Sequence, residues 1–92
     1  MTVRSLQSQE AQHVESGAIL RSHGRDALQF ELDGHTLTIP RELANDGDIL
    51  YLDTRPSWDD GRPLTEAQAA LLEPVIHEIE RFWELTAHIY RS

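Results

Sequence analysis

The chain has 92 residues and no cysteine, and its 16 acidic and 8 basic residues give a net charge of −8. This length accommodates one domain with a thin core and little room for a deep catalytic cleft, so we expect no enzyme. So negative a surface repels phosphate backbones and anionic lipids, which argues against nucleic acid or a membrane as partner. The lack of disulfides and of an apolar leader favours the cytoplasm.

The first 14 residues are polar and show no hydrophobic periodicity. They are predicted to be a loosely ordered N-terminal tail, followed by a single α+β domain over residues 15–92. Within this domain, residues 17–23 alternate weakly and predict a modest strand, which ends at the turn-forming Gly24.

A β-hairpin is the clearest local prediction. Asp33-Gly34 separates two alternating runs, residues 27–32 and 35–39, and this dipeptide favours a type I′ turn because both turn residues take positive φ. A two-residue loop fixes the register and puts all apolar partners on one face. The predicted pairs are Leu32 with His35, Phe30 with Leu37, and Leu28 with Ile39.

The next segment is expected to leave the sheet and return. Pro40 should end the strand, and residues 40–45 could form one helical turn with proline at its first position. After a turn at residues 46–48, residues 49–53 predict a strand with apolar side chains on both faces. This is typical of a central strand that is covered on each side or meets a partner. Residues 54–63 predict a polar loop.

A long helix and a closing strand complete the fold. Thr65 and Gln68 have the spacing of a capping box, and Pro74 predicts a kink or a restart within the helix. Residues 85–90 alternate like a strand. The simplest arrangement is an antiparallel sheet of four to five strands with the helix packed on one face, in the order β-β-β-β-α-β. The helix stripe comprises Leu72, Val75, Ile76, Ile79, Phe82 and Trp83.

Candidate metal and catalytic residues are few. Glu73, His77 and Glu80 share a helix face at spacings that can hold a metal, but this face lies opposite the apolar stripe, so a solvated surface explains it equally well. The five histidines lack the paired spacings of zinc motifs, and there is no cysteine nucleophile. We therefore predict no catalytic residue, no metal and no cofactor.

Aspartates and one tryptophan are the candidate binding residues. The aspartates form either a solvated acidic edge or a negative patch that meets arginines and lysines of a protein partner. The tryptophan, in a polar loop, either folds back onto the sheet, which we favour, or anchors an interface. The six candidates are Asp46, Asp48, Asp53, Trp58, Asp59 and Asp60.

One segment resembles a family of DNA-binding proteins. Residues 38–43 (TIPREL) and 47–52 (GDILYL) look like the "I-P-x-E-L … G-D" core of swapped-hairpin transcription regulators and antitoxins. The spacing between the two halves is shorter here, and the basic DNA-facing surface of those regulators is missing. A DNA-binding antitoxin or transcription regulator is therefore the alternative function.

A second resemblance covers residues 17–90. The chain is similar to bacterial polymorphic-toxin immunity proteins, nearest to the immunity protein 74 family. This likeness implies an α+β protein that neutralises a cognate toxin domain by direct stoichiometric binding. The acidic surface could then block a basic active-site cleft of the toxin, and the doubly apolar strand at residues 49–52 allows either a monomer or a homodimer. The family has no catalytic residues to transfer. The matching features are the early strands with Ile39-Pro40, the loop with Trp58, the Gly61-x-x-Leu64-Thr65 start of an apolar helix, and the short last strand.

Overall fold

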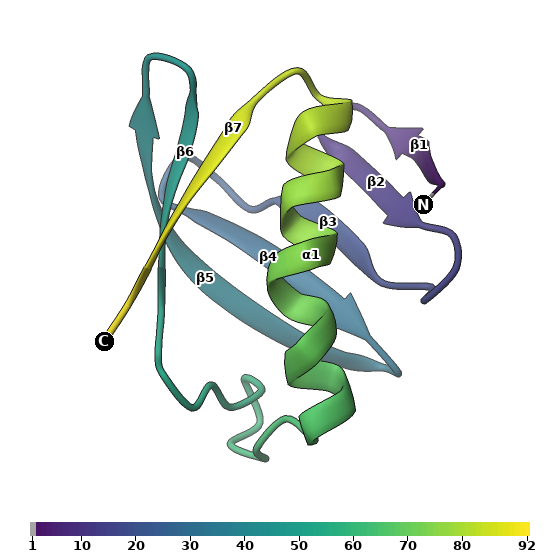
Figure 1. The fold of residues 1–92 in the computed structure, drawn as a ribbon, viewed down its shortest axis with the longest axis vertical. Coiled ribbons are helices and arrows are strands. Elements are labelled where there is room, and N and C mark those ends of the chain that lie inside the picture. Colours follow the sequence, from purple (N-terminus) through teal and green to yellow (C-terminus); the bar gives the residue numbers. More distant parts are fainter. Residues whose placement is uncertain (1) are drawn as a thin grey trace.

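The computed structural model describes residues 2–92 as a seven-stranded mixed sheet with one helix (Figure 1). The strands lie side by side in chain order; β6 and β7 are parallel, and all other neighbours are antiparallel. The elements are β1 (Val3–Gln7), β2 (Glu10–His13), β3 (Ile19–Ser22), β4 (Ala27–Leu32), β5 (His35–Ala44), β6 (Gly47–Leu52), α1 (Glu66–Phe82) and β7 (Thr86–Arg91).

The expected antiparallel sheet of four to five strands is therefore wrong. The two additional strands, β1 and β2, lie where a loose tail was expected, and they form a hairpin that pairs with β3. Buried and half-buried residues alternate over only four positions in β2, where Ala11 and His13 are buried, and so short a pattern is a weak sequence signal. The antiparallel expectation fails at β7, because the chain crosses over through α1 and returns alongside β6 in the same direction.

The hairpin of β4 and β5 confirms the predicted register. Leu32 pairs with His35, and the further pairs follow as the turn chemistry requires. Asp33 and Gly34 have φ values of 54° and 78°, the positive values that a type I′ turn needs.

The expectation that Pro40 ends its strand is also wrong, since β5 runs through it to Ala44. The reason lies in the pairing of β5. Residues up to Pro40 pair with β4, whereas pairing with β6 begins at Arg41. The missing N–H of Pro40 therefore falls where β5 changes partners, a position at which a strand tolerates proline.

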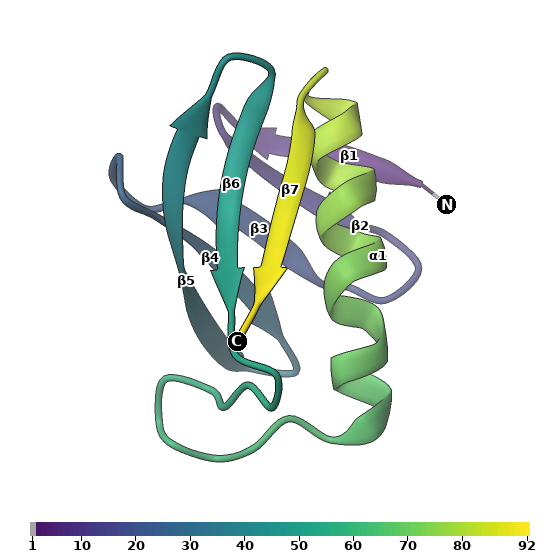
Figure 2. The ribbon, with the colours of Figure 1, turned by 60° about the vertical axis from the view of Figure 1, so that its left-hand side comes forward.

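The helix covers the concave side of the curved sheet. Figure 2 shows β5, β6 and β7 side by side, with α1 beside β7 and β1 to β4 behind. Thr65 and Gln68 form the predicted capping box, and α1 continues through Pro74 without a restart. The largest fully buried side chains form one core between helix and sheet: Leu20, Leu28, Phe30, Ile39, Leu50, Leu72, Val75, Ile76 and Ile79, joined by Glu80.

Candidate functional site

A cleft of about 470 Å³ opens where the β5–β6 turn, the end of α1 and the β1–β2 turn come together. Its lining combines apolar walls with a few convergent polar groups, the composition typical of binding sites in proteins. The apolar walls include Leu43, Trp83 and Leu85, and the polar groups are Gln9, Ser22, Arg41, Asn45 and Asp48.

Strand alternation points three of these side chains into the cleft. In β5, Arg41 and Leu43 follow the buried Ile39 at intervals of two residues, and in β6 Asp48 precedes the buried Leu50 in the same way. Leu43 and Asp48 are cross-strand partners. Leu43 lies at the rim with 62% of its surface exposed, whereas Asp48 lies at the floor with 2% exposed.

The guanidinium of Arg41 is held mainly by the turn between β3 and β4. Its Nη2 donates to Ser22 Oγ at 2.9 Å and to the carbonyl oxygen of Gly24, and its Nε donates to the carbonyl oxygen of Arg25 at 3.2 Å. Only Nη1 faces Asp48, 3.7 Å from Oδ1, which is longer than a hydrogen bond. Arg41 therefore forms an ion pair with Asp48 but no direct hydrogen bond to it.

Glu80 lies behind Asp48. It projects from α1 into the core with none of its surface exposed, and neither carboxyl oxygen has a hydrogen-bond partner. Burial, followed by the neighbouring Asp48 carboxyl, raises the pKa of Glu80 to about 9, although Arg41 acts in the opposite direction. At neutral pH, Glu80 is therefore a protonated, uncharged carboxyl next to Asp48.

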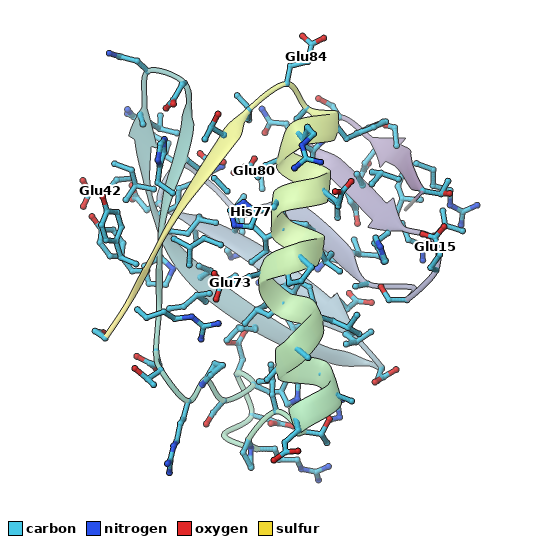
Figure 3. All side chains as sticks on the ribbon, viewed as in Figure 1. Glu15, Glu42, Glu73, His77, Glu80 and Glu84 are labelled. Atoms are coloured by element: carbon cyan, nitrogen blue, oxygen red, sulfur yellow. The ribbon has the colours of Figure 1, made fainter. Side chains whose placement is uncertain are left out.

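The prediction that Glu80 lies on the solvated face of the helix is wrong. Figure 3 shows Glu73, His77 and Glu80 along the side of α1 that faces β7, but only Glu80 is buried. Glu80 follows the buried Leu72 and Ile76 at intervals of four residues, and this spacing could have predicted that Glu80 is buried. Among residues 2–92, no group of three His, Cys, Asp or Glu side chains could hold a metal ion.

The six predicted binding residues do not form one site. Asp46 and Asp48 lie at the β5–β6 turn, whereas Asp53, Asp59 and Asp60 lie in the loop after β6, at the opposite end of the molecule (Figure 1). Asp46 is exposed and its Oδ1 lies 2.9 Å from Nε2 of His88. This hydrogen bond lowers the pKa of Asp46.

The loop residues mainly hold their own segment in place. Trp58 is buried and stacks against Phe30 and His35, with ring centroids 6.3 and 5.4 Å away, so it folds back onto the sheet. The carboxylate of Asp59 accepts hydrogen bonds from the backbone N–H and the hydroxyl of Thr38, at 2.9 and 2.6 Å. Trp58 and Asp59 therefore anchor the loop after β6 to the sheet.

Asp60 and Asp53 are exposed. Asp60 accepts a hydrogen bond from the backbone N–H of Arg62 and lies 3.6 Å from Nδ1 of His35, so it too supports the loop. The backbone carbonyl of Asp53 accepts a hydrogen bond from Arg91 of β7. The side chain of Asp53 is free to face solvent.

No protein-family model matches the sequence, and neither curated proteins nor solved structures show a similar protein. Within residues 2–92, no helix has the length and apolar character needed to cross a membrane. The cleft and its buried charges are thus the features from which a function can be inferred.

Proposed function

We propose that this protein neutralises a bacterial toxin domain by binding it one to one, as the resemblance to immunity proteins implies, and that the cleft is part of the contact surface. The observation that carries the proposal is the apolar cleft with a carboxylate at its floor. Exposed Leu43 and Leu85 flank it, and exposed apolar groups around a concave surface are typical of protein interfaces.

Charge indicates the kind of partner. Asp46 and Glu84 are exposed, and each lies next in sequence to cleft residues; Figure 3 shows Glu84 beyond the end of α1. On a chain of net charge −8, these carboxylates favour approach of a basic protein. If the toxin is a nuclease, the same carboxylates would compete with the phosphates of its substrate.

The test is complex formation with the toxin domain encoded next to this protein's gene, measured by size-exclusion chromatography with light scattering. Leu43→Glu places a charge at the exposed rim and should abolish a one-to-one complex without unfolding the protein. Tyr90→Glu is the matched control, because Tyr90 is 59% exposed and stacks with Tyr51. A complex lost with Tyr90→Glu but kept with Leu43→Glu would place the interface elsewhere.

The alternative of a DNA-binding antitoxin predicts a different result. A mobility-shift assay at low salt should then show a retarded DNA band that disappears steeply as salt is added. Such a band with the purified protein would favour DNA binding over the proposed toxin binding as the function. We assign the activity to the cytoplasm on the strength of the cysteine-free sequence.

A further inference from the structure

We infer that the outer face of β5, β6 and β7 binds an extended, arginine-bearing segment of another protein, whose guanidinium stacks on two exposed tyrosines. This face is separate from the cleft, and the inference does not depend on the proposed toxin binding. We call it the tyrosine surface, and its residues are Glu42, Ile49, Tyr51, His88 and Tyr90.

Strand alternation places these five side chains together. In β6, Ile49 and Tyr51 alternate with buried leucines, so they point away from the core. Glu42 of β5 and His88 of β7 are the cross-strand neighbours of Ile49. Tyr90 of β7 pairs with Tyr51. Figure 3 shows Glu42 on the side of the sheet away from α1, so this face is not covered by the helix.

The two tyrosines form an ordered aromatic platform in contact with solvent. Tyr51 and Tyr90 are 41% and 59% exposed, and their rings stack with centroids 6.1 Å apart and planes inclined by 25°. The Tyr51 hydroxyl donates to Oε1 of Glu42 at 2.8 Å, which fixes its ring. Rigid tyrosines of this kind provide a large contact area at a low entropic cost, as in binding surfaces of other proteins.

The charge of the tyrosine surface indicates a cation as its ligand. Oε1 of Glu42 is engaged by Tyr51, so Oε2 is the oxygen that can accept from a ligand. Of the five residues, only His88 can carry a positive charge, and its Nε2 already lies 2.9 Å from Oδ1 of Asp46. A guanidinium can stack on a tyrosine ring and donate to a neighbouring carboxylate at the same time, whereas a lysine ammonium is a compact point charge.

The nearest arginine of the chain does not occupy this position. Arg91 follows Tyr90 in β7, and by alternation its side chain points to the opposite face of the sheet. There its Nη2 donates to Glu73 of α1 at 2.8 Å. The aromatic platform beside Glu42 is therefore left for a guanidinium from another molecule.

The outer face of the other strands is different. A row of polar side chains crosses β2 to β5, and each hydrogen-bonds to the next: Glu10, Arg21, Gln29 and Thr38. The only arginine in this row is paired with two carboxylates, those of Glu10 and Glu31. These groups satisfy one another, so the binding capacity of the outer face lies over β5 to β7.

A hollow beside Tyr51 favours an extended segment over a single arginine. It has a volume of about 290 Å³, and its lining includes Pro40, Tyr51, Asp53 and Pro56. Side chains on one face of an extended chain recur every second residue. When one arginine stacks on the tyrosines, a side chain two residues away can enter the hollow. The exposed Asp53 provides a second carboxylate there.

The experiment titrates the full chain with the peptide acetyl-Arg-Thr-Arg-Thr-Arg-amide and with versions in which lysine or the uncharged citrulline replaces arginine. NMR shifts are followed at about 0.15 M salt, where long-range attraction is screened. The arginine peptide should give saturable shifts at Ile49, Tyr51 and Tyr90. We expect the lysine version to bind several-fold more weakly and the citrulline version roughly tenfold more weakly.

Two exposed substitutions test the contacts. Tyr90→Leu keeps an apolar side chain but removes the aromatic ring, and should weaken binding of the arginine peptide about two- to fivefold. Glu42→Gln keeps an acceptor for the Tyr51 hydroxyl but removes the charge, and should cause a loss of about the same size. Glu66→Gln removes one charge from the exposed first turn of α1 and should leave the affinity unchanged.

Several results would overturn the inference. Absence of saturation, or equal binding of the arginine and lysine peptides with no effect of Tyr90→Leu, would leave only attraction to the net charge. Shifts centred on Leu43 and Trp83 would place the peptide in the cleft. A dimer of the free chain in light scattering, lost with Tyr90→Glu, would show that a second copy covers the tyrosine surface. Tyr90→Leu should leave the toxin complex intact, so the two proposals fail independently.

Discussion

Glu80→Gln should stabilise the protein at neutral pH and remove a pH dependence of its stability. The carboxyl has a pKa of 4.5 in an unfolded chain and about 9 in the folded one. Between these values the folded state binds the extra proton, so the free energy of unfolding falls as pH rises, by about 1.4 kcal/mol per pH unit. At pH 7 this amounts to about 3 kcal/mol against folding.

Glutamine has no proton to bind, so the variant avoids this cost and is expected to be more stable than the wild type by about 3 kcal/mol at pH 7. The difference should shrink as the pH falls toward 4.5, where Glu80 is protonated in both states. Urea unfolding followed by tryptophan fluorescence, at several values from about pH 5.5 to about pH 7.5, measures it. This range avoids Glu10, Glu15 and Asp46, whose lowered pKa values make stability fall as the pH drops below about 4.5.

Equal slopes of stability against pH for Glu80→Gln and the wild type would refute the raised pKa of Glu80. A variant less stable than the wild type at pH 7 would refute the raised pKa as well, since the folded protein would then favour the ionised carboxylate. Glu66→Gln serves as the control, because Glu66 is exposed and should leave the slope unchanged.

Substitutions at three further positions test the contacts that hold the fold together. Gly47→Ala would place a Cβ 2.1 Å from the backbone oxygen of Thr86, so β6 and β7 must separate; we expect a loss of about 3 kcal/mol in thermal or urea unfolding, and a loss under about 1 kcal/mol would contradict the contact. Asp59→Ala removes two hydrogen bonds to Thr38 and should cost about 1–3 kcal/mol, with faster hydrogen exchange at the Thr38 amide; unchanged exchange would argue against this anchor. Thr65→Ala deletes the helix cap and should cost about 1 kcal/mol, whereas Thr65→Ser should retain most of the stability.

Local chemistry accounts for the elements that the sequence predicted correctly. The Asp33-Gly34 turn and the capping box of Thr65 and Gln68 are determined by residues within a few positions of each other, and both appear as expected. The β1–β2 hairpin is different, because its residues are mostly polar and its turn places a non-glycine residue, Gln9, at a φ of 60°. Its order comes from pairing with β3 and packing against α1, which short-range patterns do not reveal.

The candidate site was predicted only in part, for a related reason. Asp48 was chosen as a member of an exposed acidic patch, yet it is buried at the floor of a cleft. Arg41 was not selected, although it alternates with the apolar Ile39. Glu80 was assigned to the wrong face of its helix. These three groups come from β5, β6 and α1. The burial of Glu80 and its proximity to Asp48, which together raise the pKa of Glu80, exist only after the crossover brings α1 onto the sheet.

The parallel pairing of β6 with β7 joins distant parts of the chain. Gly47 pairs with Thr86, a separation of 86 − 47 = 39 residues, whereas the other neighbouring strands are joined by short turns. Closing so long a loop costs entropy before any contact compensates for it, so this pairing is expected to form late in folding. In the cleft, Trp83 and Leu85 lie next to the late-forming β7, whereas Leu43 and Asp48 lie in the hairpin of β5 and β6, which can form earlier. A ligand that contacts both pairs of residues would stabilise the paired state of β6 and β7 and slow the separation of these two strands during unfolding.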